Sequence, residues 1–397
     1  MLLGFAITQH CNLRCPHCIR DDVTTVRSLP VGLIDRVTGE AQALYGRLMV
    51  SLTGGEPLVH PEFREIVEVF ERRQVPYRFV SNGWHTRRIM PMVDRYPPTS
   101  VRLSLSGADR ETHDAERGRG SFDRVLLSVA LLTSRRIPAS LSIVIDGRDL
   151  HQIEAAAALA ESLGCTRLHF ILPQPVVGSA ERGSDLPPET WLPVRRRVER
   201  LAAAPGRKTV IALDYGAPFE GEEQLCDTLA LRRVYVDAHG RVCSCCQLSD
   251  YGFNETEVVA DLNQVTLAEA HRAYVAHLAA LQKATRPDPR SDDKFDRFPC
   301  MRCARVCGKL QWIEQYPNSS WHGVAAVADR VPEALTQSQA GRCLVQIERP
   351  STARRTPAAA PTIGRSPHDL PSRPNRSPAR SMDADSIASS AGGRRLR

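Results

Sequence analysis

Three cysteines lie within eight positions near the start of the chain, in the segment TQHCNLRCPHC at residues 8–18. Cys11, Cys15 and Cys18 are spaced C-x3-C-x2-C and follow an apolar run, Leu2–Ile7. Thiolates are soft ligands that suit iron–sulfur clusters and zinc. Three thiolates would hold three irons of a [4Fe–4S] cluster and leave the fourth iron open to a substrate or cofactor. The spacing alone also fits half of a zinc site, or a cluster completed by a distant cysteine.

Seven of the twelve cysteines lie between residues 226 and 307, and Cys165 and Cys343 stand apart from both groups. The first ten residues lack the basic segment and the small-residue cleavage site of a signal peptide. No apolar stretch reaches the roughly 20 residues needed to cross a bilayer. Twelve cysteines in such a chain indicate metal or redox chemistry rather than disulfides. We therefore expect a cytoplasmic protein without a membrane partner.

The elements that must position the first cysteines alternate between strand-like and helix-like segments over residues 1–205. Helical patterns occur, for example, at Pro61–Arg73, Phe122–Arg136 and Leu150–Leu163. This alternation predicts an α/β fold with a parallel sheet covered by helices, closed into a complete or partial barrel. The six predicted strands are Leu2–Ile7, Leu48–Leu52, Tyr77–Ser81, Ser100–Leu105, Ala139–Ile145 and Arg167–Leu172.

Polar motifs follow four of these strands at the point where each strand ends. The cysteine loop follows the first strand, and TGGEP (53–57) follows the second. SNG (81–83) and SLSG (104–107) follow the third and the fourth. Because sites in parallel α/β folds form at the carboxyl ends of the strands, the four motifs predict one shared pocket.

The composition changes twice along the rest of the chain. Residues 206–312 hold the second set of cysteines, and RVYVDAHGRVCSCC (233–246) predicts a β-hairpin with its turn at Asp237–Gly240. Residues 313–345 form an extension. Residues 346–397 are predicted to be a disordered tail, because a stretch rich in Arg, Pro, Ser and Ala buries too little apolar surface to offset its ordering entropy.

The net charge of +7 is concentrated in that tail. Residues 351–397 contain nine Arg and three Asp, so they carry six of the seven net positive charges. The rest of the chain is close to neutral and lacks the strong basic bias that binding to a phosphate backbone needs. Nucleic acid is therefore not an expected partner.

Taken together, these motifs resemble the radical S-adenosylmethionine (SAM) superfamily, whose signature C-x3-C-x-Φ-C follows the first strand of a partial (β/α)6 TIM-type barrel. Cys11, Cys15 and Cys18 match this signature, with His17 at the aromatic position that faces the adenine. The resemblance implies a [4Fe–4S] cluster whose open iron binds the amino and carboxylate groups of SAM. An external donor such as flavodoxin or ferredoxin would supply one electron, which cleaves SAM to methionine and a 5′-deoxyadenosyl radical. That radical abstracts a hydrogen atom from the substrate.

The second motif, TGGEP, resembles the GGE motif of the superfamily, in which Gly54, Gly55 and Glu56 bind the SAM amino group. Glycines let a backbone approach closely, and a carboxylate accepts charge-assisted hydrogen bonds from an ammonium group. By position, Asn82 and Ser104 are candidates to bind the ribose or the carboxylate of SAM. Their alternative role is turn formation.

The second cysteine set resembles the SPASM/twitch auxiliary-cluster domain. Cys226, Gly240 and Cys245 follow the pattern C-x13-G-x4-C, and FPCMRC (298–303) gives a later C-x2-C. DRETHDAERGRGSF (109–122) also resembles a segment common in the subfamily that has this domain. The resemblance implies one auxiliary [4Fe–4S] cluster with a role in electron transfer, held by Cys226, Cys245, Cys300 and Cys303. A zinc site is the alternative, and the spare thiols for a second auxiliary cluster or for hydrogen-atom donation are Cys243, Cys246, Cys307 and Cys343.

The expected function is a radical SAM enzyme that modifies a ribosomal peptide by cross-linking, oxidation or epimerisation. The preference for a peptide rests on the prevalence of the auxiliary domain among peptide maturases. A small-molecule dehydrogenase or epimerase for an aminocyclitol or sugar is an alternative, because little sequence precedes the first strand for a peptide-recognition domain. The second alternative is a non-catalytic redox regulator that binds an iron–sulfur cluster or zinc. Asp146 and Asp214 follow apolar runs and could face the pocket, but no catalytic acid or base is assigned.

Overall fold

The computed structural model describes residues 1–20, 26–176, 182, 186–218, 225–252, 254–287, 294–311, 313, 319 and 321. Within these residues, one sheet has the strand order β10-β9-β8-β1-β2-β3-β4-β5-β6-β7. Its strands are β1 (Leu2–Thr8), β2 (Met49–Gly54), β3 (Tyr77–Ser81), β4 (Ser100–Leu105), β5 (Ala139–Val144), β6 (Arg167–Ile171), β7 (Val210–Leu213), β8 (Arg233–Val236), β9 (Arg241–Cys243) and β10 (Val258–Asp261).

Strands β8 and β1 to β7 are paired in parallel, whereas β9 pairs antiparallel with both β8 and β10. This arrangement confirms the predicted α/β fold with a parallel sheet. The six strands predicted from the sequence are β1 to β6, and their ends differ from the prediction by at most two residues. The predicted hairpin is also confirmed as β8–β9.

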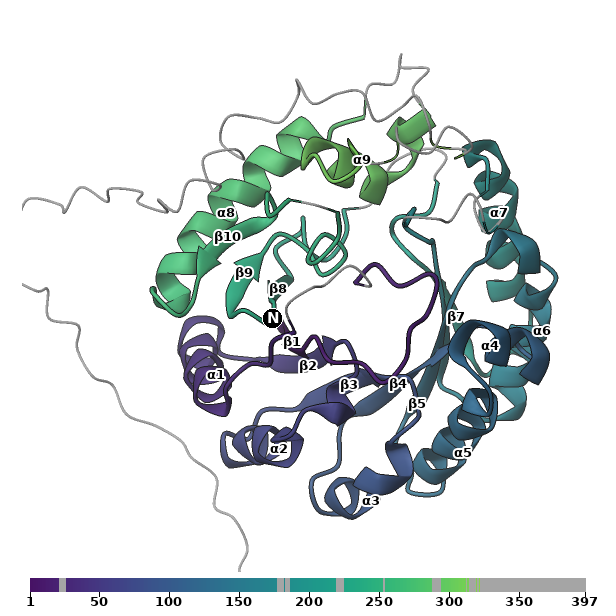
Figure 1. Cartoon of the computed structure of the whole chain (residues 1–397), viewed down its shortest axis with the longest axis horizontal. Helices are drawn as coiled ribbons and strands as arrows, with labels where there is room; N and C mark the ends of the chain where they lie inside the picture. Colours follow the sequence, from purple (N-terminus) through teal and green to yellow (C-terminus); the bar gives the residue numbers. More distant parts are fainter. Residues whose placement is uncertain are drawn as a thin grey trace, which may run out of the picture. The chain divides into compact units, whose positions relative to one another are not determined.

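Helices connect the successive parallel strands and lie outside the curved sheet, as Figure 1 shows. The predicted helices at 61–73, 122–136 and 150–163 are confirmed in slightly shorter form as α2, α5 and α6. The α-helices are α1 (Val31–Tyr45), α2 (Phe63–Arg72), α3 (Thr86–Arg95), α4 (Arg110–Arg117), α5 (Ser121–Thr133), α6 (Gln152–Ser162), α7 (Trp191–Ala202), α8 (Leu267–Ala284) and α9 (Pro299–Val306). The short 3-10 helices are η1 (Pro57–Val59), η2 (Gly147–Asp149), η3 (Pro188–Thr190) and η4 (Lys294–Arg297).

Local sequence fixes where α4 begins and ends. The Asp109 side chain caps its start by accepting a hydrogen bond of 2.9 Å from the backbone N–H of Thr112. Gly118 ends the helix with a φ of 91°, a conformation that glycine adopts without strain. These two signals determine which residues occupy the last turn of α4, where Glu116 and Arg117 lie.

The two faces of the sheet differ in chemistry. In β4, Val101, Leu103 and Leu105 are fully buried in the core that also contains residues of α5. The alternate positions Arg102 and Ser104 are half-buried and lie on the opposite, inner face. The inner face of the sheet is therefore polar and can carry a site, whereas the outer face forms the core with the helices.

The sheet continues across the domain boundary that the sequence predicts at residue 205. Strand β7 pairs with β6, and β8 pairs with β1, although both lie in the segment 206–312. All described residues belong to one compact unit, Met1–Val345. The predicted disordered tail (346–397) and nearly all of the predicted extension (313–345) lie outside the described residues. No helix among the described residues is long and apolar enough to span a membrane.

Candidate active site

The cysteine loop and the TGGEP motif are joined through their backbones. The N–H groups of Gly55 and Glu56 donate hydrogen bonds of 2.8 Å to the carbonyl oxygens of Thr8 and His10. A Cβ atom on Gly54, whose φ is 133°, would lie 2.1 Å from the Thr8 oxygen, and one on Gly55 would lie 2.3 Å from the His10 oxygen. Both glycines are therefore required for the end of β2 to dock against the segment that enters the cysteine loop. Their contact with SAM stays a prediction.

Glu56 connects the end of β2 to the end of β3. Its carboxylate is buried and accepts hydrogen bonds from the backbone N–H groups of Leu58 at 3.1 Å and Asn82 at 2.6 Å. Burial raises the pKa of Glu56 to about 7, although these hydrogen bonds favour the ionised form. The carboxyl group is thus poised to change protonation near neutral pH, and its binding of the SAM amino group stays a prediction.

Asn82 extends this connection to the cysteine loop. Its side-chain amide donates a hydrogen bond of 2.9 Å to the Asn12 side chain and lies 3.9 Å from the Cys11 sulfur. Its side-chain oxygen accepts a hydrogen bond from the Trp84 N–H. The structure therefore brings together three of the four motifs that the sequence places after the strands.

The cysteine loop presents its three sulfurs as free thiols. The Leu13 N–H donates to the Cys11 sulfur at 3.4 Å, and the Cys18 N–H donates to the Cys15 carbonyl at 3.0 Å, so the loop folds on itself. Burial raises the pKa of the Cys15 thiol to about 11. A bound metal reverses this preference, because a coordinated thiol is deprotonated. The donor set and the backbone support on Cys11 fit an iron–sulfur cluster.

His17 is held between two charged residues of α4. Its Nδ1 lies 3.3 Å from Glu116 Oε2, and its Nε2 lies 3.3 Å from Arg117 Nη2. Burial lowers the pKa of His17, so the ring is neutral at physiological pH. Since the arginine can only donate, Nε2 accepts and Nδ1 carries the proton that is donated to Glu116. The ring is thus fixed in one tautomer and one orientation.

The same two residues of α4 connect His17 to the ends of β4 and β5. Arg117 Nε donates to Ser106 Oγ at 2.6 Å, and Arg148 Nη2 bridges Glu116 Oε1 at 2.7 Å and Asp146 Oδ2 at 2.6 Å. The hydrogen bond from His17, followed by the one from Arg148, lowers the pKa of Glu116 to about 2. A network of fixed charges therefore surrounds the aromatic position of the cysteine motif.

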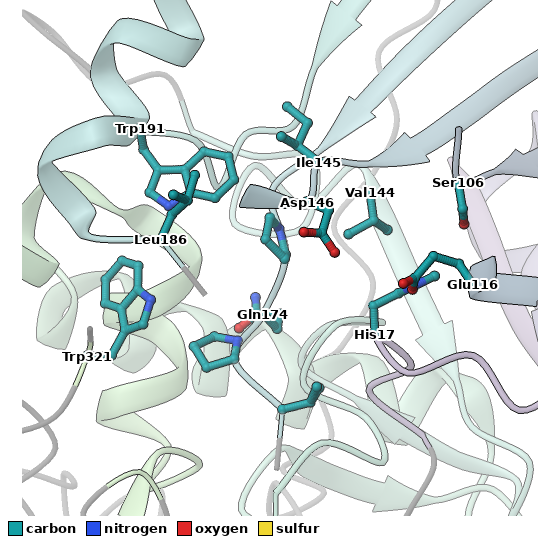
Figure 2. A pocket seen from close by; sticks show the side chains of 13 residues that line it. His17, Ser106, Glu116, Val144, Ile145, Asp146, Gln174, Leu186, Trp191 and Trp321 are labelled. Atoms are coloured by element: carbon teal, nitrogen blue, oxygen red, sulfur yellow. The ribbon is translucent and has the colours of Figure 1, made fainter. Parts of the chain in front are cut away.

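These residues border a hollow of about 570 Å³ at the carboxyl ends of β4, β5 and β6 (Figure 2). Asp146 faces it, as the sequence suggested. Ser106 lines it, two positions after the predicted Ser104 on the inner face of β4. The lining residues are His17, Ser106, Glu116, Val144, Ile145, Asp146, Pro173, Gln174, Pro175, Val176, Leu186, Trp191 and Trp321. An apolar wall that includes Leu186 and Trp191 lies opposite the charged network (Figure 2).

A second hollow, of about 560 Å³, is lined by the four predicted auxiliary ligands, Cys226, Cys245, Cys300 and Cys303. These four sulfurs come from three separate segments of the chain. Gly216 lies against one of them, since a Cβ there would be 2.8 Å from the Cys300 sulfur. The donor set fits a fully ligated cluster, and ligation itself stays a prediction.

Backbone donors support two of these sulfurs. The Leu229 N–H donates to the Cys226 sulfur and the Gln247 N–H to the Cys245 sulfur, each at 3.4 Å. Hydrogen bonds to cluster sulfurs are a common means of setting a reduction potential. No group of three or more Cys, His, Asp or Glu side chains in the described ranges lies close enough to hold one metal ion. Cluster ligands need not lie that close, because each thiolate binds a different iron.

The remaining cysteines of the described segments do not line the second hollow, although the Cys246 thiol forms a hydrogen bond with the Cys245 thiol. The Cys246 sulfur accepts a contact of 3.7 Å from Arg233 Nη1. Cys243 and Cys307 are buried, and so is Cys165, as the sequence predicted for a small apolar residue. Cys343 lies outside the described residues.

Several residues around the hollow were not selected from the sequence. Glu116 and Arg117 lie in the segment 109–122. The sequence analysis compared this segment with the subfamily but predicted no role for its residues. Gln174 follows β6. It could have been predicted as a site residue, because sites in parallel α/β folds form from polar residues at the carboxyl ends of the strands. Trp191 and Trp321 carry no comparable sequence signal, because they come from a helix start and from a segment far along the chain.

Comparison with known proteins agrees with this geometry. Residues 5–160 match the family model of the radical SAM superfamily. The mycofactocin maturase MftC of Mycolicibacterium smegmatis is 33% identical over 41% of this chain, and the match spans 42% of that maturase, less than half its length. The PqqA peptide cyclase of Ruegeria pomeroyi is 27% identical over 82% of this chain and 76% of its own.

A solved structure supports the fold. Streptococcus suis SuiB bound to precursor peptide SuiA superposes with a TM-score of 0.57 at 13% identity, covering 76% of this chain and 70% of SuiB. The family match and the fold agree with the cysteine motif and its position after β1. This chain therefore carries a radical SAM domain over residues 5–160.

Proposed function

We propose that this protein is a radical SAM enzyme that modifies a peptide. One observation carries the proposal. Glu56 and Asn82 are hydrogen-bonded to each other, Asn82 contacts Cys11 of the cysteine loop, and His17 of the same loop lines a hollow. These residues come from the ends of successive strands, where parallel α/β folds place their active sites. The site therefore combines three thiolates with a binding space at the same end of the sheet.

The residues that would hold the first cluster are Cys11, Cys15 and Cys18. When bound with SAM, such a cluster supplies the one-electron cleavage that generates a 5′-deoxyadenosyl radical. The chain itself supplies positioning. Glu56 offers a buried carboxylate to the SAM ammonium group, and Asn82 holds the loop that carries Cys11.

The hollow beside the cysteine loop would receive the adenosyl part of SAM and the reacting part of the substrate. His17 presents a neutral, fixed aromatic ring at its wall, and Ser106 offers a hydroxyl group oriented by Arg117. Ser104 remains a candidate for the ribose or the carboxylate of SAM. Trp191 and Leu186 form an apolar surface on the opposite side of the hollow (Figure 2).

The second hollow would hold one auxiliary [4Fe–4S] cluster through Cys226, Cys245, Cys300 and Cys303. Because four protein thiolates leave no open iron, its role would be electron transfer. It would take an electron from the substrate or pass one from an external donor such as flavodoxin or ferredoxin. The peptide substrate is supported by the names of two relatives, a maturase and a peptide cyclase.

The experiment is anaerobic reconstitution of the full chain with iron and sulfide, followed by reduction with dithionite in the presence of SAM. We expect about eight irons per chain, four for each cluster, and formation of 5′-deoxyadenosine. C15A should lose this product, whereas C165A, a change at a buried cysteine outside both groups, should retain it. Intact clusters that yield no 5′-deoxyadenosine would overturn the proposal.

A further inference from the structure

The inner face of the sheet carries four arginines, called here the arginine cluster. They are Arg78 on β3, Arg102 on β4, Arg167 on β6 and Arg233 on β8. The first two are half-buried, and Arg167 is exposed at the start of its strand. Arginine on the inner face of a sheet calls for an explanation, because the charge must lose part of its hydration there.

The strand register shows that these side chains share one region. Arg102 pairs with Val80 on one side and with Ser140 on the other, and Ser140 pairs with Arg167, so Arg102 and Arg167 lie in one row across the sheet. Arg78 precedes Val80 by two positions and therefore points to the same face. The sheet curves around this face (Figure 1). In addition to burial, the charges of Arg78, Arg233 and Arg167 each lower the pKa of Arg102, so the four guanidinium groups lie within electrostatic range of one another.

The serines beside the arginines in this register leave room for the guanidinium groups. Ser51 and Ser100 are the direct partners of Arg78 on its two neighbouring strands. Ser140 separates Arg102 from Arg167. Small hydroxyl side chains at these positions add hydrogen-bonding capacity and do not neutralise the charge.

Three of the four positive charges have no partner among the described side chains, whereas Arg233 contacts the Cys246 sulfur at 3.7 Å and lies 4.0 Å from Asp227. Within the described part of the chain, the side chains of Arg78, Arg102 and Arg167 have no hydrogen bond or ion pair. Burial lowers the pKa of Arg102 to about 10, and the charges of Arg78, Arg233 and Arg167 add to the effect. An anion placed among these groups would relieve both the repulsion and the lost hydration.

Two acidic residues, Asp227 and Asp214, lie near the arginine cluster, and neither neutralises its charge. Asp227 lies 4.0 Å from Arg233 and is itself partly exposed. Asp214 is close enough to Arg102 and Arg233 to be stabilised by them, yet burial raises its pKa. Its carboxylate already accepts hydrogen bonds from Gln247 and Gly216.

Two buried polar nitrogen atoms beside the arginine cluster also lack hydrogen-bond partners among the described residues. His169 lies on the inner face of β6, and its Nδ1 has no hydrogen bond among the described residues. The Nε of Arg233 is buried and unpaired in the same way. Buried polar atoms are normally satisfied, so unsatisfied ones beside uncompensated charges indicate a ligand.

We propose that the arginine cluster binds a carboxylate of the peptide substrate, either an Asp or Glu side chain or the C-terminus of the peptide. This inference rests on the proposed function and names the substrate class as an acidic peptide. Carboxylates are the anionic groups of an unmodified peptide, and the planar guanidinium group matches their geometry.

The position of the arginine cluster relative to the hollow lined by His17 predicts the spacing between the carboxylate and the reacting residue of the peptide. Arg102 precedes Ser106, which lines the hollow, by four residues along β4 and the turn that follows it. Four residues of extended chain span about 13 Å. A substrate with its reacting residue in the hollow would therefore place its carboxylate about four residues away.

The test uses the reconstituted full chain with SAM and three peptides of about eight residues that carry an uncharged BODIPY dye and differ only in charge. One has a C-terminal amide and no acidic side chain, one has a single internal Glu, and one has a free C-terminal carboxylate. Fluorescence anisotropy measures Kd at low and at raised salt. We expect at least one carboxylate peptide to bind about 10-fold or more tighter than the neutral peptide, with an advantage that falls as salt rises.

The variants R78Q and R102Q should remove that advantage, and R102K should retain part of it. R64Q, a change at an exposed arginine of α2, is the matched control and should leave it intact. Equal binding of charged and neutral peptides, including no binding of any, overturns the inference, and so does an advantage that survives in both R78Q and R102Q. Formation of 5′-deoxyadenosine without peptide is measured separately, so failure of the proposed function is distinguished from failure of the carboxylate site.

Discussion

The backbone N–H of Asn82 donates a hydrogen bond of 2.6 Å to the carboxylate of Glu56, which fastens the end of β3 to the end of β2. The side chain of the same asparagine reaches Asn12 and the Cys11 sulfur. One buried carboxylate therefore organises the loop that would hold the catalytic cluster. Its protonation should affect both the stability of the protein and the geometry of the site.

The first prediction concerns the pH dependence of stability. Burial raises the pKa of Glu56 to about 7 from an ordinary value of 4.5. A carboxyl whose pKa is raised by folding contributes stability at low pH and loses it as the pH rises through the folded-state value. Between about pH 4.5 and pH 7, the free energy of unfolding of the wild type should fall by about 3 kcal/mol relative to E56Q. Urea unfolding across this range measures it.

The control for this prediction is E71Q, a change at an exposed glutamate of α2. It should follow the wild-type pH profile. A wild type and an E56Q variant with parallel profiles would contradict the assigned pKa of Glu56.

The second prediction concerns the glycines of the TGGEP motif. G54A places a methyl group 2.1 Å from the Thr8 carbonyl at a φ of 133°, so the end of β2 must separate from the cysteine loop. We expect a loss of about 3 kcal/mol or more in unfolding free energy and a lower iron content after reconstitution. G32A, in α1 where nothing lies within 4 Å, should instead gain about 0.5–1 kcal/mol. Iron content unchanged in a folded G54A would show that this docking does not support the cluster.

The sequence predicted the parallel sheet, because apolar strands and the polar motifs that follow them are local signals. Strands β1 to β6 and the convergence of the first three motifs followed from these signals. The four auxiliary cysteines also face one hollow, as their spacing suggested. The signals for the strands and motifs lie within short stretches of chain, whereas the second hollow combines cysteines from three separate segments.

Other features depend on contacts between distant segments. The parallel pairing of β8 with β1 could not be predicted from the hairpin pattern, which sets only the β8–β9 pair. The glycines of TGGEP are explained by the carbonyls of Thr8 and His10, so their spacing alone suggested only a contact with ligand. The arginine cluster becomes visible only when the strand register aligns residues far apart in sequence.

The third prediction concerns the orientation of His17. E116Q removes the carboxylate that accepts the His17 proton and that pairs with Arg148. Because an amide can be rotated to donate toward Nδ1, the ring would lose its fixed tautomer and orientation. We expect the Kd for SAM to rise about 10-fold, as measured by anaerobic titration calorimetry on the reconstituted protein. E111Q, an exposed change in the first turn of the same helix, should bind SAM as the wild type does, and an equal Kd for both variants would exclude this role of Glu116.

The fourth prediction separates the two proposed clusters. C300A removes one of the four sulfurs that line the second hollow, next to Gly216, and leaves the cysteine loop at residues 11–18 unchanged. Without Cys300, one iron of the auxiliary cluster would lose its thiolate and become exposed, which makes that cluster labile. We therefore expect the iron content to fall from about eight toward about four per chain. Cleavage of SAM in the absence of substrate should continue, because the first cluster is intact, whereas modification of the peptide should stop.

Iron and sulfide analysis, together with electron paramagnetic resonance of the reduced protein, measures this separation. C243A, which removes a buried thiol outside the second hollow, serves as the control and should keep both clusters. A C300A variant that retains full iron would show that this cysteine does not bind a cluster. Loss of SAM cleavage in folded C300A would instead contradict this separation and show that the two proposed metal centres depend on each other.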